Sequence, residues 1–168
     1  VSIDPESGAL RTLWQSDGHQ LSPPIFAEDK IILRTSTSEL VALSRDGSAQ
    51  PIWCESLQAW WALPPSQAGD LVLVSDGRPM HGEGYLIAFS TSTGQQVWKQ
   101  PTDGLISRSM TADEQRVVYL NGQRQLEALD LKSGQSLWKQ DYKRVYSPPL
   151  ICAGKLFVVV RGAAPSGE

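Results

Sequence analysis

The chain has 168 residues, of which 40% are hydrophobic and 20% are charged, and its formal net charge is −3. This balance is typical of a globular protein with a sizeable core, and it lacks the Lys/Arg cluster that a nucleic-acid backbone requires. No stretch approaches the ~18 to 20 apolar residues that a membrane-spanning helix needs. The composition therefore argues against nucleic acid as a partner and against a helical membrane span within this chain.

Four short strand signals follow one another in the first well-defined unit of the chain. They are Pro23–Ala27, Lys30–Thr35, Glu39–Ser44 and a last strand that ends near Trp53. The turns between them contain Glu28-Asp29 and Arg45-Asp46-Gly47. Short strands at a spacing of about 8 to 12 residues, with Gly and Asp in the turns, indicate an all-β sandwich, barrel or propeller.

The same unit recurs along the chain. Tryptophans stand at positions 14, 53, 98 and 138, which gives a period of about 40 residues. Four strands per repeat of this length select a β-propeller, in which each repeat is one four-stranded antiparallel blade. No segment has a sustained helical periodicity. The prediction is an all-β, partial propeller of about four blades with essentially no helix.

A short cassette within each repeat has a structural explanation. The segments that end in Trp98 and Trp138 place a glycine four residues before the tryptophan, at a turn where positive φ is expected. The indole can then lie flat against the adjacent blade, and a small alanine leaves room for it. We predict that these residues hold neighbouring blades together: Trp14, Trp53, Trp98, Trp138, Gly94, Gly134, Ala88 and Ala128.

The repeats begin and stop in mid-blade, so the sequence is interpreted as part of a larger propeller. The predicted units are a half blade at 1–15, full blades at 20–55, 60–100 and 105–140, and a half blade at 145–161. Alternatively, the two half blades could join to form one blade and close a ring of four blades. Exposed strand edges are expected to be completed by the remaining blades of a parent propeller or by a second copy of the chain.

The repeat resembles the pyrroloquinoline-quinone (PQQ)-type β-propeller family. The resemblance rests on the pattern A-x-D-x-x-x-G-x-x-x-W at Ala128, Asp130, Gly134 and Trp138. It is supported by Ser-Pro-Pro openings at 22–24 and 147–149, and it covers almost the whole chain. The family includes quinone enzymes, cofactor-free scaffolds and sensor domains, so the resemblance implies the fold more specifically than the function.

Two irregularities in one repeat break the pattern and mark a candidate recognition surface. The first is the pair Trp60-Trp61, and the second is a hairpin over 75–84 that is about six residues longer than its counterparts. Exposed Trp and Arg on a rigid scaffold are common anchors of protein interfaces, and variable loops often carry recognition. The candidate binding residues are Trp60, Trp61, Arg78, Met80 and His81. The alternative is that one tryptophan packs in its own blade and the hairpin is a tolerated surface loop.

No residue pattern indicates catalysis or a metal site. The two histidines, His19 and His81, have no metal-ligand spacing. Asp76 and Glu83 flank the long hairpin and could in principle bind a cation, but they are expected to be solvated acidic residues. Cys54 and Cys152 are expected to be unpaired, mostly buried thiols.

Three functions are compatible with this sequence. The segment 28–47 is similar to blades of a non-enzymatic propeller lipoprotein from the bacterial outer-membrane protein assembly machinery. That likeness implies an extracytoplasmic, periplasmic module that binds another protein or an extended peptide and needs no cofactor. The alternatives are a dehydrogenase that uses PQQ and calcium, whose adjacent cysteines are missing here, and an extracytoplasmic sensor domain of a kinase or receptor.

Overall fold

The computed structural model describes residues 2–3, 5–12, 14–15, 21–48, 50–59, 63–78, 82–104, 106, 110–141, 145 and 147–159. All regular secondary structure in this part of the chain is antiparallel β-sheet, which confirms the predicted fold class. Across the described ranges, no helix has the length and apolar character needed to cross a membrane.

Within these described ranges there are three complete four-stranded sheets, and each runs in simple order from its first strand to its fourth. The first sheet contains β3 (Ile25–Ala27), β4 (Lys30–Arg34), β5 (Glu39–Ser44) and β6 (Pro51–Ser56). The second contains β7 (Ser66–Ala68), β8 (Leu71–Arg78), β9 (Glu83–Ser90) and β10 (Gln96–Asp103). The third contains β11 (Thr111–Ala112), β12 (Arg116–Leu120), β13 (Leu126–Asp130) and β14 (Ser136–Gln140). We call these sheets blades 1, 2 and 3.

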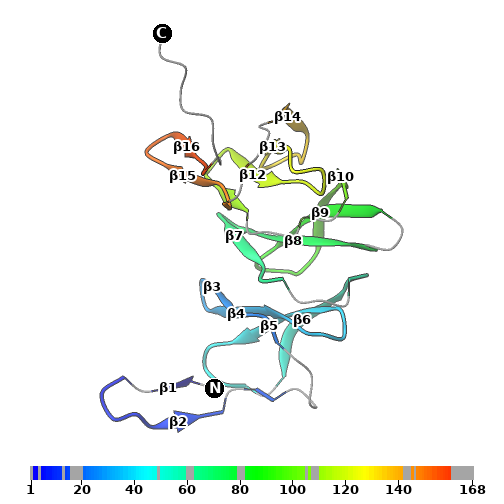
Figure 1. Ribbon diagram of the computed structural model, residues 1–168. Coiled ribbons are helices and arrows are strands. Elements are labelled where there is room, and N and C mark those ends of the chain that lie inside the picture. The colour runs from blue at the N-terminus through cyan, green and yellow to red at the C-terminus, as the bar shows by residue number, and fades with distance from the viewer. Residues whose placement is uncertain are drawn as a thin grey trace.

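A two-stranded sheet lies at each end of this series. It is formed by β1 (Ser2–Ile3) with β2 (Leu10–Arg11) at one end and by β15 (Leu150–Cys152) with β16 (Lys155–Phe157) at the other. Figure 1 shows the sheets following one another in chain order, with β1–β2 and β15–β16 far apart. We call these two sheets the N-terminal and C-terminal half-blades.

The core lies between successive blades because the second strand of each blade is apolar on both faces. One cluster joins Ile32 and Leu40 of blade 1 to Val72 and Phe89 of blade 2. A second cluster joins blade 2 to blade 3 in the same way. Burial on both faces explains the near-continuous apolar sequences of β4, β8 and β12.

The register places one recurring trio at the centre of each blade. Ile32 lies opposite Ala42, which lies opposite Trp53. The same pairings give Leu73, Ala88 and Trp98 in blade 2, and Val118, Ala128 and Trp138 in blade 3. These pairings allow equivalent positions of different blades to be compared directly.

Candidate functional site

A fully buried arginine connects blades 1 and 2 next to the predicted recognition surface. Arg34, at the end of β4, donates from Nη1 to the carbonyl of Ser75 at 2.7 Å and from Nη2 to the carbonyl of Ala59 at 3.1 Å. Burial lowers the pKa of Arg34, and the negative charge of Asp76 opposes that shift. The guanidinium therefore holds the connection between the blades against a strand of the second blade.

Asp76 holds the same connection from the side of blade 2. It is 1% exposed, and its Oδ1 accepts hydrogen bonds from the backbone N–H groups of Gln58 at 2.9 Å and Ala59 at 2.8 Å. The expectation that Asp76 is solvated is therefore wrong. The acidic residue is buried because two backbone donors of the inter-blade connection satisfy it.

Residues equivalent to Asp76 in the other blades bind their own hairpins instead. The Oγ1 of Thr35 accepts from the Glu39 N–H at 3.2 Å, and the Oδ1 of Asn121 accepts from the Gln125 N–H at 2.9 Å. Those two hairpins are tight, so the side chain reaches back across the turn. The longer hairpin of blade 2 leaves the side chain of Asp76 available for the connection.

The long hairpin of blade 2 extends the sheet. β8 and β9 remain paired as far as Arg78 opposite Glu83, and β10 follows them to Asp103. Each of these three strands has eight residues, compared with at most six in the other complete blades. We call this part of β8, β9 and β10, over 75–78, 83–85 and 101–103, the blade 2 extension.

Glycines allow the extension to approach its neighbours closely. A Cβ on Gly84 would lie 2.2 Å from the carbonyl oxygen of Gly104, and a Cβ on Gly122 would lie 2.9 Å from the Cα of Gly104. No side chain fits at either position without a backbone shift. The extension is thus packed backbone to backbone against the hairpin of blade 3.

The outer surface of the extension is polar and charged. Arg78 and Glu83 are exposed, and Asp103 forms an ion pair with Lys139 of blade 3. Lys99 places its ammonium 4.0 Å from the centroid of the Tyr85 ring on the adjacent strand. These contacts fix the base of the extension and leave Arg78 facing solvent.

The structure places one of the five predicted binding residues, Arg78, on the extension. Trp60, Trp61, Met80 and His81 lie outside the described residues, as does His19. Gln58 and Ala59, which directly precede Trp60 in the sequence, donate backbone hydrogen bonds to the carboxylate of Asp76. Asp76 stands two residues before Arg78 on β8. The inter-blade connection and the long hairpin thus emerge on the same side of blade 2.

Sequence reasoning did not identify Arg34 as part of this arrangement. The feature in the sequence that could have indicated it is an arginine at the end of the apolar strand KIILR. The equivalent position of the next blade is occupied by Ser75. A charged residue in such a place is either solvated or buried with partners, and the sequence alone does not distinguish these cases.

The recurring tryptophans contact the next blade at its glycine turn. The Trp53 ring packs on Gly94, and its Nε1 donates to the carbonyl of Thr91 at 3.1 Å. The Trp98 ring packs on Gly134 in the same way and donates to the carbonyl of Leu131 at 2.9 Å. Both glycines have positive φ, at 75° and 71°.

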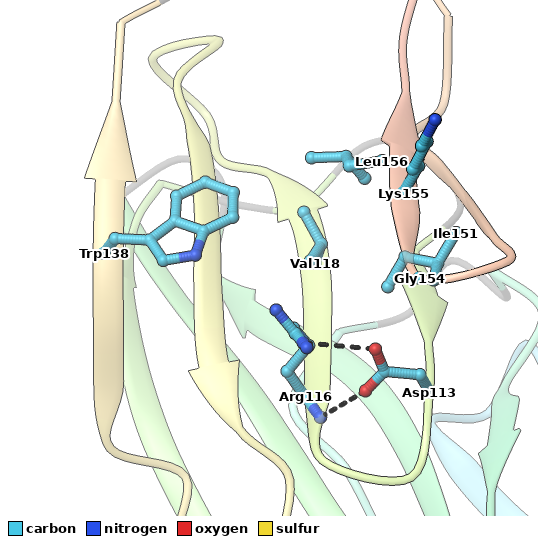
Figure 2. Close-up of a pocket in the computed structure, with 8 residues that line it drawn as sticks. All are labelled: Asp113, Arg116, Val118, Trp138, Ile151, Gly154, Lys155 and Leu156. Atoms are coloured by element: carbon cyan, nitrogen blue, oxygen red, sulfur yellow. Dashed lines mark hydrogen bonds and ion pairs between the residues drawn. The ribbon is translucent and has the colours of Figure 1, made fainter.

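Trp138 faces a small cavity between blade 3 and the C-terminal half-blade (Figure 2). The cavity has a volume of about 40 Å³ and is closed on the other side by Ile151 and Leu156. At its rim, the Nε of Arg116 lies 3.1 Å from Oδ2 of Asp113. The Asp113 carboxylate also accepts from the backbone N–H of Arg116 at 2.8 Å. This cavity is an incompletely filled junction between blades.

The described residues contain no group of three or more His, Cys, Asp or Glu side chains that could hold a metal ion. Cys54 and Cys152 are free thiols, and both are exposed, so the prediction that they are mostly buried is wrong. Cys54 lies on the outermost strand of blade 1, and Cys152 lies on a face of the C-terminal half-blade that the described residues leave open. Partial burial and the charges of Glu39 and Glu55 raise the pKa of the Cys54 thiol.

Comparison with known families identifies the repeat. Residues 48–162, more than half of the chain, match the family described as outer membrane protein assembly factor BamB. The chain belongs to the BamB family. The predicted PQQ-like repeat is thereby confirmed, and the three sheets are blades of a BamB-like propeller.

Individual relatives agree with the BamB assignment. The outer membrane protein assembly factor BamB of Vibrio cholerae serotype O1 is 29% identical over 148 residues, which is 75% of this chain and 35% of that protein. The present chain thus spans about a third of the length of this relative. The crystal structure of BamB from Moraxella catarrhalis superposes with a TM-score of 0.64 at 14% identity, over 83% of this chain and 42% of that one.

Propeller enzymes share the fold of this BamB-family chain. A europium-containing methanol dehydrogenase superposes with a TM-score of 0.61 at 15% identity, over 71% of this chain and 31% of that one. At such low identity the likeness concerns the arrangement of blades.

Proposed function

We propose that this chain is a non-enzymatic, protein-binding part of a BamB-type propeller that acts in outer-membrane protein assembly. Membership of the BamB family supports this role, since the matched relatives are named as assembly factors. The same relationship supports a periplasmic location. The proposed partner is another protein or an extended peptide, bound without PQQ or calcium.

The observation on which the proposed site rests is the blade 2 extension with its buried support. Arg34 and Asp76 fix the connection that runs toward Trp60 and Trp61, while the lengthened strands present Arg78 to solvent. A rigid base under exposed residues reduces the entropy lost on binding. We therefore propose that Trp60, Trp61, Arg78, Met80 and His81 form the partner-binding surface.

Site-specific photo-crosslinking tests this surface. The chain is exported to the periplasm of Vibrio cholerae cells that lack their own BamB, with a photo-reactive amino acid in place of Arg78. We expect adducts with other outer-membrane assembly proteins, identified by mass spectrometry. The matched control places the probe at Lys132, an exposed turn residue between β13 and β14, where no such adducts should form. Equal adducts at both positions, or none at position 78, would overturn the proposed surface.

A separate experiment tests the proposal that no cofactor is used. Quinone enzymes of this fold are expected to have adjacent cysteines over the quinone, whereas the two cysteines here stand at 54 and 152. The purified chain is mixed with PQQ and calcium and passed through a desalting column. We expect no quinone absorbance to remain with the protein, and a stoichiometric bound chromophore would instead favour the dehydrogenase alternative.

A further inference from the structure

The arginines in the described part of the chain fall into two groups. Members of the first group donate to backbone carbonyls or pair with a carboxylate of the same chain: Arg11, Arg34, Arg45 and Arg116. Arg78 and Arg124 form the second group, because both are exposed and their side chains make no hydrogen bond or ion pair with another described residue. Their guanidinium groups are therefore available to a partner.

Both of these arginines lie at turns between a second and a third strand. Arg78 ends β8 of blade 2, and Arg124 lies in the turn 121–125 that joins β12 to β13 of blade 3. The two blades have the same strand order and share one apolar core, so their equivalent turns emerge on the same side of the sheets. Arg78 and Arg124 are thus presented to the same side of the molecule.

The two turns are joined through their backbones. A Cβ on Gly122, in the turn of blade 3, would lie 2.9 Å from the Cα of Gly104, which directly follows β10. The last residue of β10, Asp103, lies opposite Glu83, and Glu83 lies opposite Arg78. The blade 2 extension and the turn of blade 3 therefore form one continuous surface.

Asn121 fixes the turn that carries Arg124. The Oδ1 of Asn121 accepts from the N–H groups of Gln123 at 3.0 Å and Gln125 at 2.9 Å, and the Nδ2 donates to Oε1 of Gln125 at 3.2 Å. The N–H of Arg124 donates to the carbonyl of Asn121 at 2.9 Å. A backbone held in this way reduces the entropy that is lost when the arginine binds a partner.

The backbone conformation of Arg124 is unfavourable for an arginine. Its φ is 63°, in the left-handed region that favours glycine and asparagine. The equivalent Ser38 of blade 1 has a φ of 64°, so the turn itself requires this conformation. Strained backbone positions concentrate at functional sites. An exposed arginine without internal contacts gains nothing for the fold at such a position, which points to a role in binding.

The carboxylates nearest to this surface do not neutralise the two arginines. Asp103 is paired with Lys139. Glu83 is the cross-strand neighbour of Arg78, but the ion pairs among the described residues do not include these two side chains. The two guanidinium groups can therefore accept carboxylates from outside, while Glu83 repels them.

We propose that Arg78 and Arg124 together bind an acidic segment of a partner protein across the blade 2 extension and the turn of blade 3. This inference rests on the proposed function, and it names the chemistry of the partner: a segment that offers carboxylates to both guanidinium groups. The planar guanidinium binds a carboxylate through two parallel N–H···O hydrogen bonds. Glu83 works against such a segment and so limits its affinity.

Three short fluorescent peptides test the preference for acidic segments. They alternate threonine with glutamate, with lysine or with glutamine, and fluorescence anisotropy measures their binding to the 168-residue chain at low salt. We expect the glutamate peptide to bind about tenfold more tightly than the glutamine peptide, and added salt to remove this difference. Equal affinities, a preference for the lysine peptide, or no binding of the glutamate peptide would overturn the acidic partner.

Charge-removing variants locate the contact on this surface. Arg78→Gln and Arg124→Gln should each weaken binding of the glutamate peptide about three- to fivefold, whereas Glu83→Gln should strengthen it. Lys132→Gln is the matched control, because Lys132 is an exposed cation in the turn between β13 and β14, and it should leave the affinity unchanged. Weaker binding by Glu83→Gln, or an equal loss with Lys132→Gln, would contradict the proposed contact.

Arg124→Gly separates binding from folding. Glycine relieves the unfavourable φ and removes the guanidinium, so the urea midpoint should not fall while the glutamate peptide binds about three- to fivefold more weakly. A lower midpoint with unchanged binding would show that Arg124 serves the fold and would overturn its role. This inference and the proposed function fail separately. Crosslinked adducts from position 78 without a preference for the glutamate peptide would leave the binding surface in place and overturn the acidic partner, whereas absence of adducts would overturn the surface itself.

Discussion

At the scale of single residues, the glycine turns and tryptophans act as pairs that belong to different blades. Gly134→Ala should destabilise the chain, because the new Cβ would lie 2.6 Å from Cδ2 of Trp98 and the backbone would keep a φ of 71°. Overpacking of this kind costs about 1–3 kcal/mol, in addition to the strain of alanine at positive φ. The free energy of unfolding in urea measures the loss.

Gly69→Ala separates the two contributions to that loss. Gly69 has a φ of 59°, and a Cβ placed on it would meet no atom within 4 Å, so its substitution adds backbone strain alone. We expect Gly134→Ala to cost at least about 1 kcal/mol more than Gly69→Ala. Equal losses would mean that the indole does not press on the glycine.

Asp76 is the residue-scale link between packing and the proposed binding surface. Asp76→Ala removes the acceptor of the Gln58 and Ala59 N–H groups and also removes the negative charge that acts on the buried Arg34. We expect a loss of about 3 kcal/mol in the free energy of unfolding. Asp103→Ala, which removes an exposed ion pair with Lys139, should cost less than about 1 kcal/mol and serves as the control.

At the scale of elements, the strands were predictable from the sequence and the network under the extension was not. Recurrence of Trp, Gly and Ala in register gave the blade pattern, because each blade solves the same packing problem. The additional residues of the hairpin over 75–84 indicated a difference, but whether they lengthened the strands or formed a loop depended on cross-strand pairing. Burial of Asp76 depended on two backbone donors from the connection between blades 1 and 2, which no local pattern reveals.

The turn between β11 and β12 gives an element-scale prediction of pH dependence. Burial raises the pKa of Asp113, but hydrogen bonds from the N–H groups of Gln115 and Arg116 and the guanidinium charge outweigh it, so the pKa lies below the ordinary value of an aspartate. A lowered pKa stabilises the fold above the unfolded-state pKa, and that contribution is lost as the pH falls through the folded-state value. Asp113→Asn should therefore cost about 1 kcal/mol at pH 7.

The difference in the free energy of unfolding between wild type and Asp113→Asn should shrink as the pH is lowered through the ordinary pKa of an aspartate and below it. Urea unfolding at pH 7, 4 and 3 measures it. Lys155→Gln, at the rim of the same cavity, is the control and should show no such convergence. A constant difference across this range would show that the Asp113 charge does not contribute to the turn.

At the scale of the whole molecule, each blade contacts mainly its neighbours, so stability should vary along the chain. Such arrays behave approximately as sums of repeat and interface terms. Blade 2 is covered on both faces by clusters shared with blades 1 and 3. The C-terminal half-blade is covered on one face by blade 3, and Leu10 and Arg11 of β2 in the N-terminal half-blade are exposed. Amide hydrogen exchange at low protein concentration should therefore be slowest in β8 and β9 and fastest in the two half-blades.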